Sequence, residues 1–283
     1  MITYGMMQGR LTEPKGRGIQ FFPFENWKDE FKIARQIGLD EIEFIFDYEN
    51  YKNNPLWSID GIEEIRTLII ETGIRVNSIC FDYFMRKPFF KANNTIEREL
   101  LYQENKMFLE KIMGASRDLG IKLIEIPLVD SSVIKNSEEK EMFREFLYNI
   151  IEQQGDNDIF FGLETDLPPL ELREYIGSFN SPFVKANYDT GNSSALGYDV
   201  YQEITVLKGL IFNIHIKDRV LNGETVRLGS GNVDFVSFFK VLKEINYDGS
   251  IILQAARGED GYEIGTVTGQ LNFIKEYVKN FNI

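Results

Sequence analysis

Short apolar segments alternate with amphipathic segments along the whole chain, and this alternation constrains the fold more than any other feature. Apolar runs bounded by turn residues predict strands, and apolar positions three to four residues apart predict helices. Eight segments of each kind follow one another in strict order. The expected strands are 2–7, 41–46, 75–81, 122–127, 159–166, 184–189, 212–217 and 250–255. The expected helices are 27–37, 59–72, 96–119, 137–153, 169–176, 199–208, 234–245 and 266–281.

Repeated strand–helix units imply a parallel sheet, and eight units in 283 residues predict a closed (β/α)8 TIM barrel of the α/β class. Gly38, Gly73 and Gly120 support the boundaries because each follows a helical segment, where a C′ glycine ends a helix. Asp60 and Asp234 lie where an N-cap or first-turn acid is favoured. An open doubly wound sheet is the alternative, but no expected strand enters a helix through a Gly-x-Gly-x-x-Gly turn.

The composition excludes several classes of protein. A formal net charge of −13 opposes binding to nucleic acid and to anionic membranes. No run approaches the roughly 20 apolar residues of a membrane span. The N-terminus lacks the basic and apolar regions of a signal peptide, and the one cysteine, Cys80, can form no internal disulfide. We therefore expect a cytoplasmic protein, with one domain over residues 1–283 because no linker-like stretch interrupts the chain.

The only histidine, His215, lies in the middle of the expected strand 212–217. A period of two places Asn213, His215 and Lys217 on one face of that strand. Strands of a parallel sheet are buried on both faces and are nearly all apolar, and burying three polar groups without partners costs several kcal/mol. The polar face is therefore expected to line a metal, a substrate or water. The alternative is a core histidine bonded to a carbonyl group.

Four polar residues, Glu164, Asp189, His215 and Gln254, lie near the carboxyl ends of four consecutive expected strands. Neighbouring strands lie about 4.8 Å apart, so inward side chains at one level can converge on one ion. The set of mainly oxygen donors favours a divalent metal, Mn2+ or Mg2+, with Co2+, Fe2+ or Zn2+ as alternatives. The competing interpretation is that the acids are separate loop caps, with Asp189 forming an Asx-turn before Thr190.

Short motifs extend this pattern along the chain. They are Gln8-Gly9-Arg10-Leu11, Ile42-Glu43, Gly162-Leu163-Glu164, Tyr188-Asp189-Thr190-Gly191-Asn192, Ile214-His215-Ile216-Lys217-Asp218, Leu228-Gly229-Ser230-Gly231-Asn232-Val233-Asp234-Phe235 and Tyr247-Asp248-Gly249. In their order and barrel positions they resemble the xylose isomerase-like TIM barrels of the sugar phosphate isomerase/epimerase superfamily. The resemblance covers essentially the full length.

This resemblance implies a metal-dependent isomerase or epimerase that acts on a small sugar or sugar derivative. Glu164, Asp189 and His215 match the family's metal ligands, and the family usually has glutamate where Gln254 stands. Glu164 would abstract the proton next to a carbonyl, and the metal would stabilise the enediolate. An amide oxygen can still bind the metal, but Gln254 has no titratable group. We therefore expect Lys217 as a second catalytic acid or base, with an ion pair to Asp189 or Glu164 as the alternative role of Lys217. Glu125 and Glu43 are other candidates for the second acid or base.

The substrate is expected to be a small-molecule sugar, with its phosphorylation left open. The residues predicted to bind it are Gln8, Arg10, Glu43, Glu125, Asn192, Arg219 and Arg257. Arg10, Arg219 and Arg257 follow strands that adjoin in a closed barrel, and arginines suit carboxylate or phosphate groups. Asn192 departs from the histidine that many family members carry there.

Two further features leave alternatives open. Gly229-Ser230-Gly231 precedes an expected helix and could hold an anion on its backbone N–H groups or form a tight turn. Aromatic residues crowd the early βα-loops. Some could pack on an apolar face of the sugar, but most are expected in lid packing or in a subunit interface, such as that of a homodimer. They are Phe21, Phe22, Phe24, Trp57, Tyr83, Phe84, Phe89 and Phe90.

Other functions on the same barrel stay open. A sugar or sugar-acid dehydratase or lyase needs no second carboxyl at Gln254, and a non-catalytic sugar-binding barrel would retain none of the chemistry. A DNA-repair endonuclease of the superfamily is opposed by the single histidine and the acidic charge, since that chemistry needs a histidine-rich cluster of metals.

Overall fold

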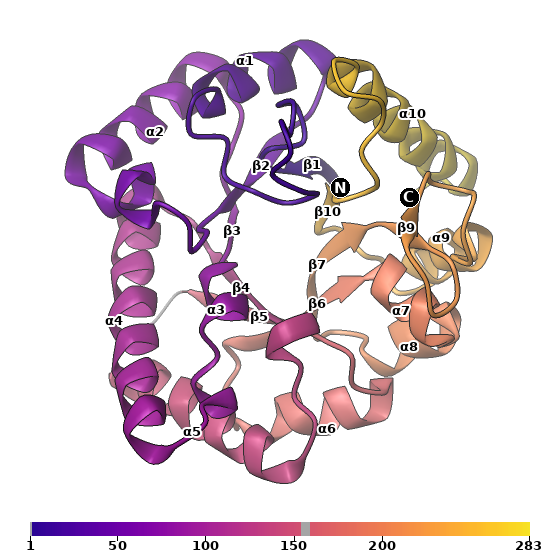
Figure 1. The fold of residues 1–283 in the computed structure, drawn as a ribbon. Coiled ribbons are helices and arrows are strands. Elements are labelled where there is room, and N and C mark those ends of the chain that lie inside the picture. The colour runs from indigo at the N-terminus through magenta and orange to yellow at the C-terminus, as the bar shows by residue number, and fades with distance from the viewer. Residues whose placement is uncertain (1, 154–158) are drawn as a thin grey trace.

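The computed structural model describes residues 2–153 and 159–283. Parallel strands close into a barrel in the order β1-β10-β7-β6-β5-β4-β3-β2, and helices surround it (Figure 1). The strands are β1 (Thr3–Met7), β2 (Glu41–Ile45), β3 (Ser78–Cys80), β4 (Leu123–Leu128), β5 (Phe160–Thr165), β6 (Val184–Asp189), β7 (Ile211–Ile216) and β10 (Ser250–Leu253). The expected (β/α)8 TIM barrel is therefore confirmed.

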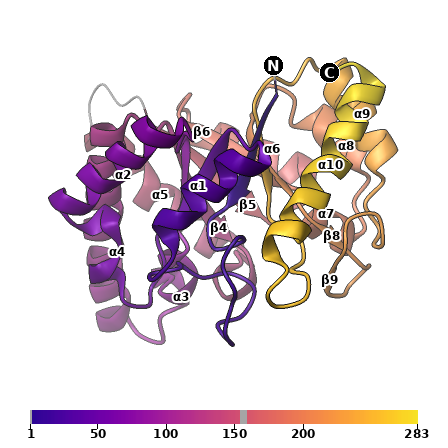
Figure 2. The ribbon, with the colours of Figure 1, turned by 90° about the horizontal axis from the view of Figure 1, so that it is seen from above.

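The helices that were expected from the sequence form the outer layer (Figure 2). They are α1 (Trp27–Ile37), α2 (Ile59–Thr72), α4 (Thr95–Leu119), α5 (Ser137–Gln153), α6 (Pro169–Ser178), α8 (Val200–Val206), α9 (Phe235–Glu244) and α10 (Glu263–Phe281). Gly38, Gly73 and Gly120 end α1, α2 and α4 with φ angles of 82°, 72° and 73°, as a C′ glycine should. Asp234 caps α9, whereas Asp60 lies in the first turn of α2.

Several short elements were not expected, and they follow the carboxyl ends of strands. Helix α3 (Tyr83–Arg86) follows β3, α7 (Thr190–Leu196) follows β6, and the hairpin of β8 (Asp218–Arg219) and β9 (Thr225–Val226) follows β7. Single 3-10 turns also occur, at Tyr51–Asn53, Pro55–Trp57, Phe89–Lys91 and Asp130–Ser132. The hairpin and α3 lie at the end of the barrel away from the C-terminus (Figure 2). They enlarge the end at which barrel enzymes carry their chemistry.

The main hydrophobic core lies between the barrel and its helices. The early aromatic residues belong to this interior: Tyr83 stacks on Phe108 of α4 at 4.2 Å between ring centroids. Six of the eight are buried, and Phe24 and Trp57 are partly buried against the same core. Most of these rings are packed inside the chain, where they hold the early βα-loops against the barrel and its helices. No helix within the described residues is long and apolar enough to cross a membrane.

The inside of the barrel is divided between apolar and polar side chains. Met7, Ile45, Cys80 and Ile252 form a small buried apolar cluster on β1, β2, β3 and β10. Buried polar side chains gather mainly on the other strands, and they are Glu43, Ser78, Glu125, Glu164, Asn187, Asp189, Asn213 and His215. Burial raises the pKa of the Cys80 thiol well above its ordinary value, as expected for a small buried apolar residue.

Candidate functional site

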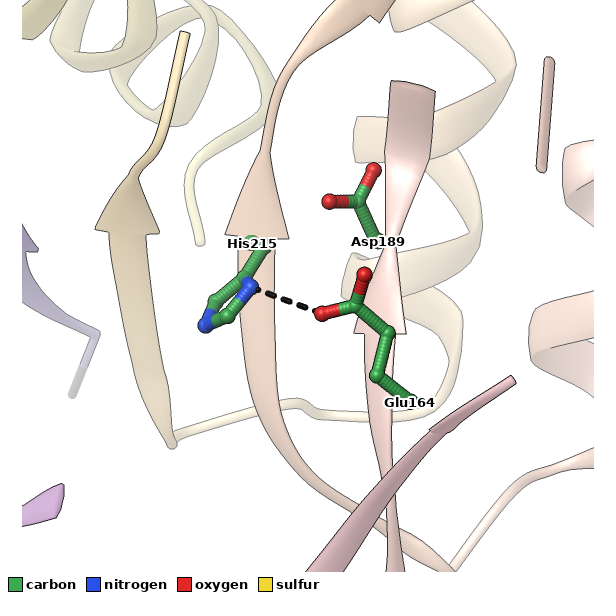
Figure 3. A group of neighbouring side chains, drawn as sticks. All are labelled: Glu164, Asp189 and His215. Carbon is green, nitrogen blue, oxygen red and sulfur yellow. Dashed lines mark ion pairs between the residues drawn. The ribbon is translucent and has the colours of Figure 1, made fainter. Parts of the chain in front are cut away.

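Three side chains converge at the carboxyl ends of β5, β6 and β7 (Figure 3). Glu164, Asp189 and His215 each offer one ligand atom, and these atoms lie within 4.8 Å of one another. The closest pair is His215 Nδ1 and Glu164 Oε2, at 3.1 Å. The strand register explains the convergence, because Asp189 and His215 are paired residues of β6 and β7. The three residues expected to meet at one ion are therefore brought together.

Asp189 has a different partner for each of its carboxylate oxygens. Oδ1 accepts a hydrogen bond from the backbone N–H of Asn192 at 2.8 Å and so caps α7. Oδ2 forms an ion pair with Lys217 Nζ at 2.8 Å. Burial alone would raise the pKa of Asp189, but Lys217 and His215 outweigh burial and lower it below the ordinary value. The helix cap anticipated as an alternative is thus present, and it leaves the second oxygen facing charged side chains.

His215 is held from both sides by carboxylates. Its Nε2 lies 2.7 Å from Glu43 Oε1, and neither side chain is exposed. Glu43 Oε2 in turn accepts hydrogen bonds from Ser78 Oγ at 2.6 Å and Asn213 Nδ2 at 2.8 Å. Burial lowers the pKa of His215, but Glu43 and Glu164 more than offset burial, and the pKa lies well above its ordinary value. A core histidine bonded to a carbonyl group is therefore excluded.

Two asparagines orient the Glu164 carboxylate. Asn187 Nδ2 donates to Oε2 at 3.2 Å, and Asn192 Nδ2 donates to Oε1 at 2.5 Å. Asn187 Nδ2 also lies 3.2 Å from His215 Nδ1, and its Oδ1 accepts from Asn213 Nδ2 at 2.9 Å. Glu164 is consequently fixed at a defined position rather than free to rotate toward solvent.

Gln254, at the end of β10, has one bonded and one unbonded amide atom. Its Nε2 donates to Gln20 Oε1 at 2.9 Å. Its Oε1 is buried and has no hydrogen-bond partner among the described residues. A buried polar atom without a partner is costly in a folded protein. The side chain thus presents a free oxygen acceptor at the site.

A cavity of about 600 Å3 lies at this end of the barrel. Its lining includes Arg10, Glu125, Glu164, Asn192, Lys217, Arg219 and Gln254. Arg17, Gln20, Asp82, Arg86, Asp130 and Glu224 also contribute charged or polar groups to it. Among the residues predicted to bind substrate, Gln8, Glu43 and Arg257 do not line this cavity. Gln8 instead accepts the backbone N–H of Ile45 on its side-chain oxygen, at 3.1 Å.

Arg10 and Arg257 connect the loops that follow β1 and β10, because each guanidinium group donates hydrogen bonds to backbone oxygens of the other loop. Arg10 donates to the backbone oxygens of Ala255 at 3.1 Å and Gln254 at 3.3 Å. Arg257 donates to the backbone oxygens of Ile19, Thr12 and Gly9 at 2.9, 3.0 and 2.9 Å. Burial and Arg257 lower the pKa of Arg10 to about 9.

Arg219 is partly committed as well. It donates to the Gly223 backbone oxygen through Nε and Nη2, and to Asn192 Oδ1 through Nη1 at 2.9 Å.

The glycine-rich loop after β9 is filled by a carboxylate of this chain. Asp218 Oδ2 accepts from the N–H groups of Gly229 and Gly231, both at 2.9 Å. The anion expected as one option for this loop is therefore an internal side chain.

Glu125 lies deeper in the barrel than Glu164. It precedes Pro127, the β4 residue paired with Glu164, by two positions, and neither of its carboxylate oxygens has a hydrogen-bond partner among the described residues. Burial, reinforced by Glu164, raises the pKa of Glu125 well above its ordinary value. Glu125 thus contributes a carboxyl group with a raised pKa to the lining of the cavity.

The sequence did not single out Gln20, Ser78, Asp82 or Asn187 as functional candidates. Asn187 could have been found, because it lies two residues before Asp189 and therefore points into the barrel as well. Asp82 directly follows an expected strand, which was also a usable signal. Gln20 lies in the long segment between β1 and α1, where no periodicity indicates which way a side chain points.

Known proteins match this chain in both sequence and fold. Residues 31–275 match the family described as xylose isomerase-like TIM barrel. An L-ribulose-5-phosphate 3-epimerase of Shigella flexneri is 27% identical over 238 residues, which cover 81% of this chain and 82% of that protein. The structure of an L-ribulose 3-epimerase superposes with a TM-score of 0.76 at 15% identity, covering 100% of this chain and 96% of the other. A D-allulose 3-epimerase from Methylomonas sp., solved in complex with D-allulose, gives 0.74 at 17% identity, with 98% and 97% covered. The chain therefore belongs to the xylose isomerase-like TIM-barrel family, as a sugar isomerase/epimerase-like enzyme.

Proposed function

We propose that this protein is a divalent-metal-dependent epimerase or isomerase of a small ketose or ketose phosphate. The observation that carries the proposal is the convergence of Glu164, Asp189 and His215, with ligand atoms within 4.8 Å of one another, beside a cavity of about 600 Å3. The relatives named as ketose 3-epimerases support the same class of substrate.

The residues present fit a divalent ion. Glu164, Asp189 and His215 would hold it together with Gln254, whose buried Oε1 has no partner among the described residues. Three oxygen donors and one imidazole favour Mn2+ or Mg2+, and Co2+, Fe2+ and Zn2+ suit the same set less well. Glu43 supports the assignment, because metal-binding histidines usually donate their other N–H to a carboxylate. A bound ion would polarise the sugar carbonyl and stabilise the enediolate.

Glu164 is the proposed general base. It would take the proton from the carbon next to the carbonyl, and its geometry favours this because Asn187 and Asn192 hold both oxygens in place. Lys217 also lines the cavity and is paired with Asp189, so its ammonium can donate a proton or a hydrogen bond to the sugar. Lys217 was expected from the sequence as the second acid or base, and its pairing with Asp189 favours a donor role.

Asn192, Arg219 and Glu125 line the cavity and are the proposed substrate contacts from the sequence-derived set. The contacts of the other four residues favour supporting roles. Glu43 orients His215, Gln8 binds the backbone of β2, and Arg10 and Arg257 join the loops that follow β1 and β10.

A sugar dehydratase is the second candidate, and Gln254 is the observation that favours it. A one-base elimination needs no titratable group at the end of β10, and an amide cannot exchange protons there. The two candidates differ in the product, which keeps the mass of the substrate in one case and loses water in the other.

The test is hydrogen exchange in deuterium oxide with a panel of ketopentoses, ketohexoses and their terminal phosphates, including L-ribulose 5-phosphate and D-allulose. We expect the Mn2+-loaded protein to exchange the hydrogen on the carbon next to the carbonyl for deuterium, and the sugar to lose no water. Glu164→Gln should lower this rate by roughly 10^2 to 10^4 because the base is removed. Glu174→Gln, on the exposed face of α6, serves as the matched control and should keep the wild-type rate. Exchange that persists in Glu164→Gln would overturn the assignment of the base.

A further inference from the structure

Epimerisation requires two proton-transfer groups, and this inference rests on the proposed function. One group removes a proton from one face of the carbon, and a second returns a proton to the opposite face. Glu164 can serve the first face, and the amide of Gln254 cannot serve the other. The remaining question is which group in the cavity faces Glu164 from the other side.

Asp82 lies across the barrel mouth from His215. It follows β3, which stands four strands from β7 in either direction around the barrel and is therefore opposite His215. Asp82 lines the same cavity as Glu164, and 8% of its surface is exposed. A sugar in this cavity would consequently lie between Asp82 and His215, with Glu164 on β5, two strands from Asp82.

Gln20 links Asp82 to Gln254 and fixes the direction of both. Its Nε2 donates to Asp82 Oδ1 at 2.8 Å, and its Oε1 accepts from Gln254 Nε2 at 2.9 Å. One amide has a donor end and an acceptor end, so Gln20 can serve a carboxylate at one of these positions and needs a donor at the other. The hydrogen-bond chain Asp82–Gln20–Gln254 therefore accommodates a carboxylate at only one of its two ends. In this protein the carboxylate is that of Asp82, and position 254 carries an amide.

We propose that Asp82 is the second proton-transfer group and acts on the face of the sugar opposite to Glu164. Glu164 takes the C–H proton, and the electron pair of that bond forms the C=C bond of the enediolate as the carbonyl becomes an oxyanion. The carboxylic acid of Asp82 then gives its proton to the same carbon from the other side, and the carbonyl re-forms. Glu164 ends protonated and Asp82 ionised, and exchange of one proton with water restores both.

The surroundings of Asp82 suit a group that both gives and takes a proton. Burial, followed by the like charge of Asp47, raises its pKa to about 7. The other groups that face it are Gln20 and Arg86, which lower the pKa, Glu164, which raises it, and the buried thiol of Cys80. Both protonation states are populated near neutral pH, as efficient general acid–base catalysis requires.

The other titratable groups of the cavity are less well placed. Lys217 is paired with Asp189, and an ammonium has no lone pair with which to take a proton. Glu125 lies on β4, next to β5, and deeper than Glu164, so it approaches from the same side. Asp130 and Glu224 are exposed residues at the cavity edge.

The experiment follows each epimer separately in deuterium oxide, using the same sugar panel and the C3 epimers of its members. In Asp82→Asn, epimerisation should fall by roughly 10^2 or more, while the epimer whose hydrogen faces Glu164 still exchanges it. The opposite epimer should exchange nothing. Adding Gln254→Glu to Asp82→Asn should recover epimerisation by about tenfold or more, because Gln20 can then reverse its amide and donate to the new carboxylate.

Asp47→Asn is the matched control, since Asp47 lies beside Asp82 without lining the cavity. This variant should keep epimerisation. Because a neighbouring negative charge is removed, the pKa of Asp82 should fall, and the part of the pH–rate profile that reports Asp82 should move to lower pH. Wild-type epimerisation in a folded Asp82→Asn, or equal loss of exchange from both epimers, would overturn the inference alone. A wild type that exchanges hydrogen with no sugar of the panel would overturn the proposed function and this inference together.

Discussion

His215 lies between two carboxylates, and each contacts a different ring nitrogen. Glu43 lies at Nε2 and Glu164 at Nδ1, and Glu43 is itself held by Ser78 and Asn213. The contact with Glu43 leaves Nδ1 directed toward the candidate metal ligands. Carboxylates in this position fix the ring and raise its strength as a ligand.

Glu43→Gln is expected to weaken Mn2+ binding by about 10- to 100-fold, because the amide holds the imidazole less firmly than the carboxylate does. Titration calorimetry of the metal-free protein measures the change. Glu41→Gln provides the control on the same strand, since Glu41 is equally buried but bonds to Thr3 and Asn77. Equal Mn2+ affinity in Glu43→Gln and the wild type would contradict this role.

At the residue scale, the candidate metal ligands could be predicted from the sequence. The contacts that hold them in place could not. Glu164, Asp189 and His215 were recognisable because inward positions alternate along strands and polar residues are rare there. Glu43 and His215 are separated by 172 residues, and nothing in the spacing of the sequence indicates that they touch. Arg10 and Arg257 were expected to bind an anion, and in the structure they donate hydrogen bonds to backbone oxygens. The sequence could not indicate these contacts, because a side-chain type does not reveal whether a backbone oxygen or a substrate will accept its hydrogen bonds.

At the scale of elements, the segment between β1 and α1 is held against the site by charged side chains. Glu30 of α1 accepts hydrogen bonds from the backbone N–H groups of Gly9 and Leu11, and Arg257 donates to three backbone oxygens of the same segment. This segment carries Gln20, which contacts both Asp82 and Gln254. Its position therefore depends on contacts that lie outside the cavity.

Arg257→Met should loosen residues 8–20, because three hydrogen bonds from a charged donor are removed and each contributes about 1.5–3 kcal/mol. Hydrogen exchange followed by mass spectrometry should show faster exchange in this segment, by roughly tenfold or more. The control is Arg66→Met on α2, where the guanidinium contacts Glu63 and Asp118 at the surface. Unchanged protection of residues 8–20 would show that Arg257 does not hold them.

The regular elements were predictable and the short ones were not. Helices such as α1 and α2 carry an apolar face and a terminal glycine, so their bounds agree with the expected ones. Helices α3 and α7 have 4 and 7 residues, too few to show a period, and their formation depends on tertiary contacts. The α7 cap is an exception, because Asp189 was considered as a cap before Thr190 and does accept the backbone N–H of Asn192.

At the scale of the whole molecule, several buried carboxyl groups couple stability to pH. Burial raises the pKa of Glu30 and Glu203 to about 7. Glu203, on α8, accepts hydrogen bonds from Tyr188 and Ser193 and lies outside the candidate site. Its folded pKa lies above the unfolded one, so the native state binds more protons between about 4.5 and 7. The stability that this carboxyl contributes at low pH is therefore lost as pH rises through 7.

Glu203→Gln should reduce the fall in unfolding free energy between pH 5 and 8 by about 1–3 kcal/mol, since the titrating group is removed. Urea unfolding at both pH values in the presence of a chelator measures the difference. Glu276→Gln, on the exposed side of α10, should keep the wild-type pH dependence. A Glu203→Gln variant with the wild-type slope would place the titration elsewhere.

The central claim is that this barrel holds one divalent ion on Glu164, Asp189, His215 and Gln254, and metal content tests it most directly. Mass spectrometry of protein purified without a histidine tag should find about one divalent ion per chain, and the ion should be lost in both Asp189→Ala and His215→Ala. A wild-type chain that binds no metal even after incubation with Mn2+, Co2+ or Zn2+ would contradict the account.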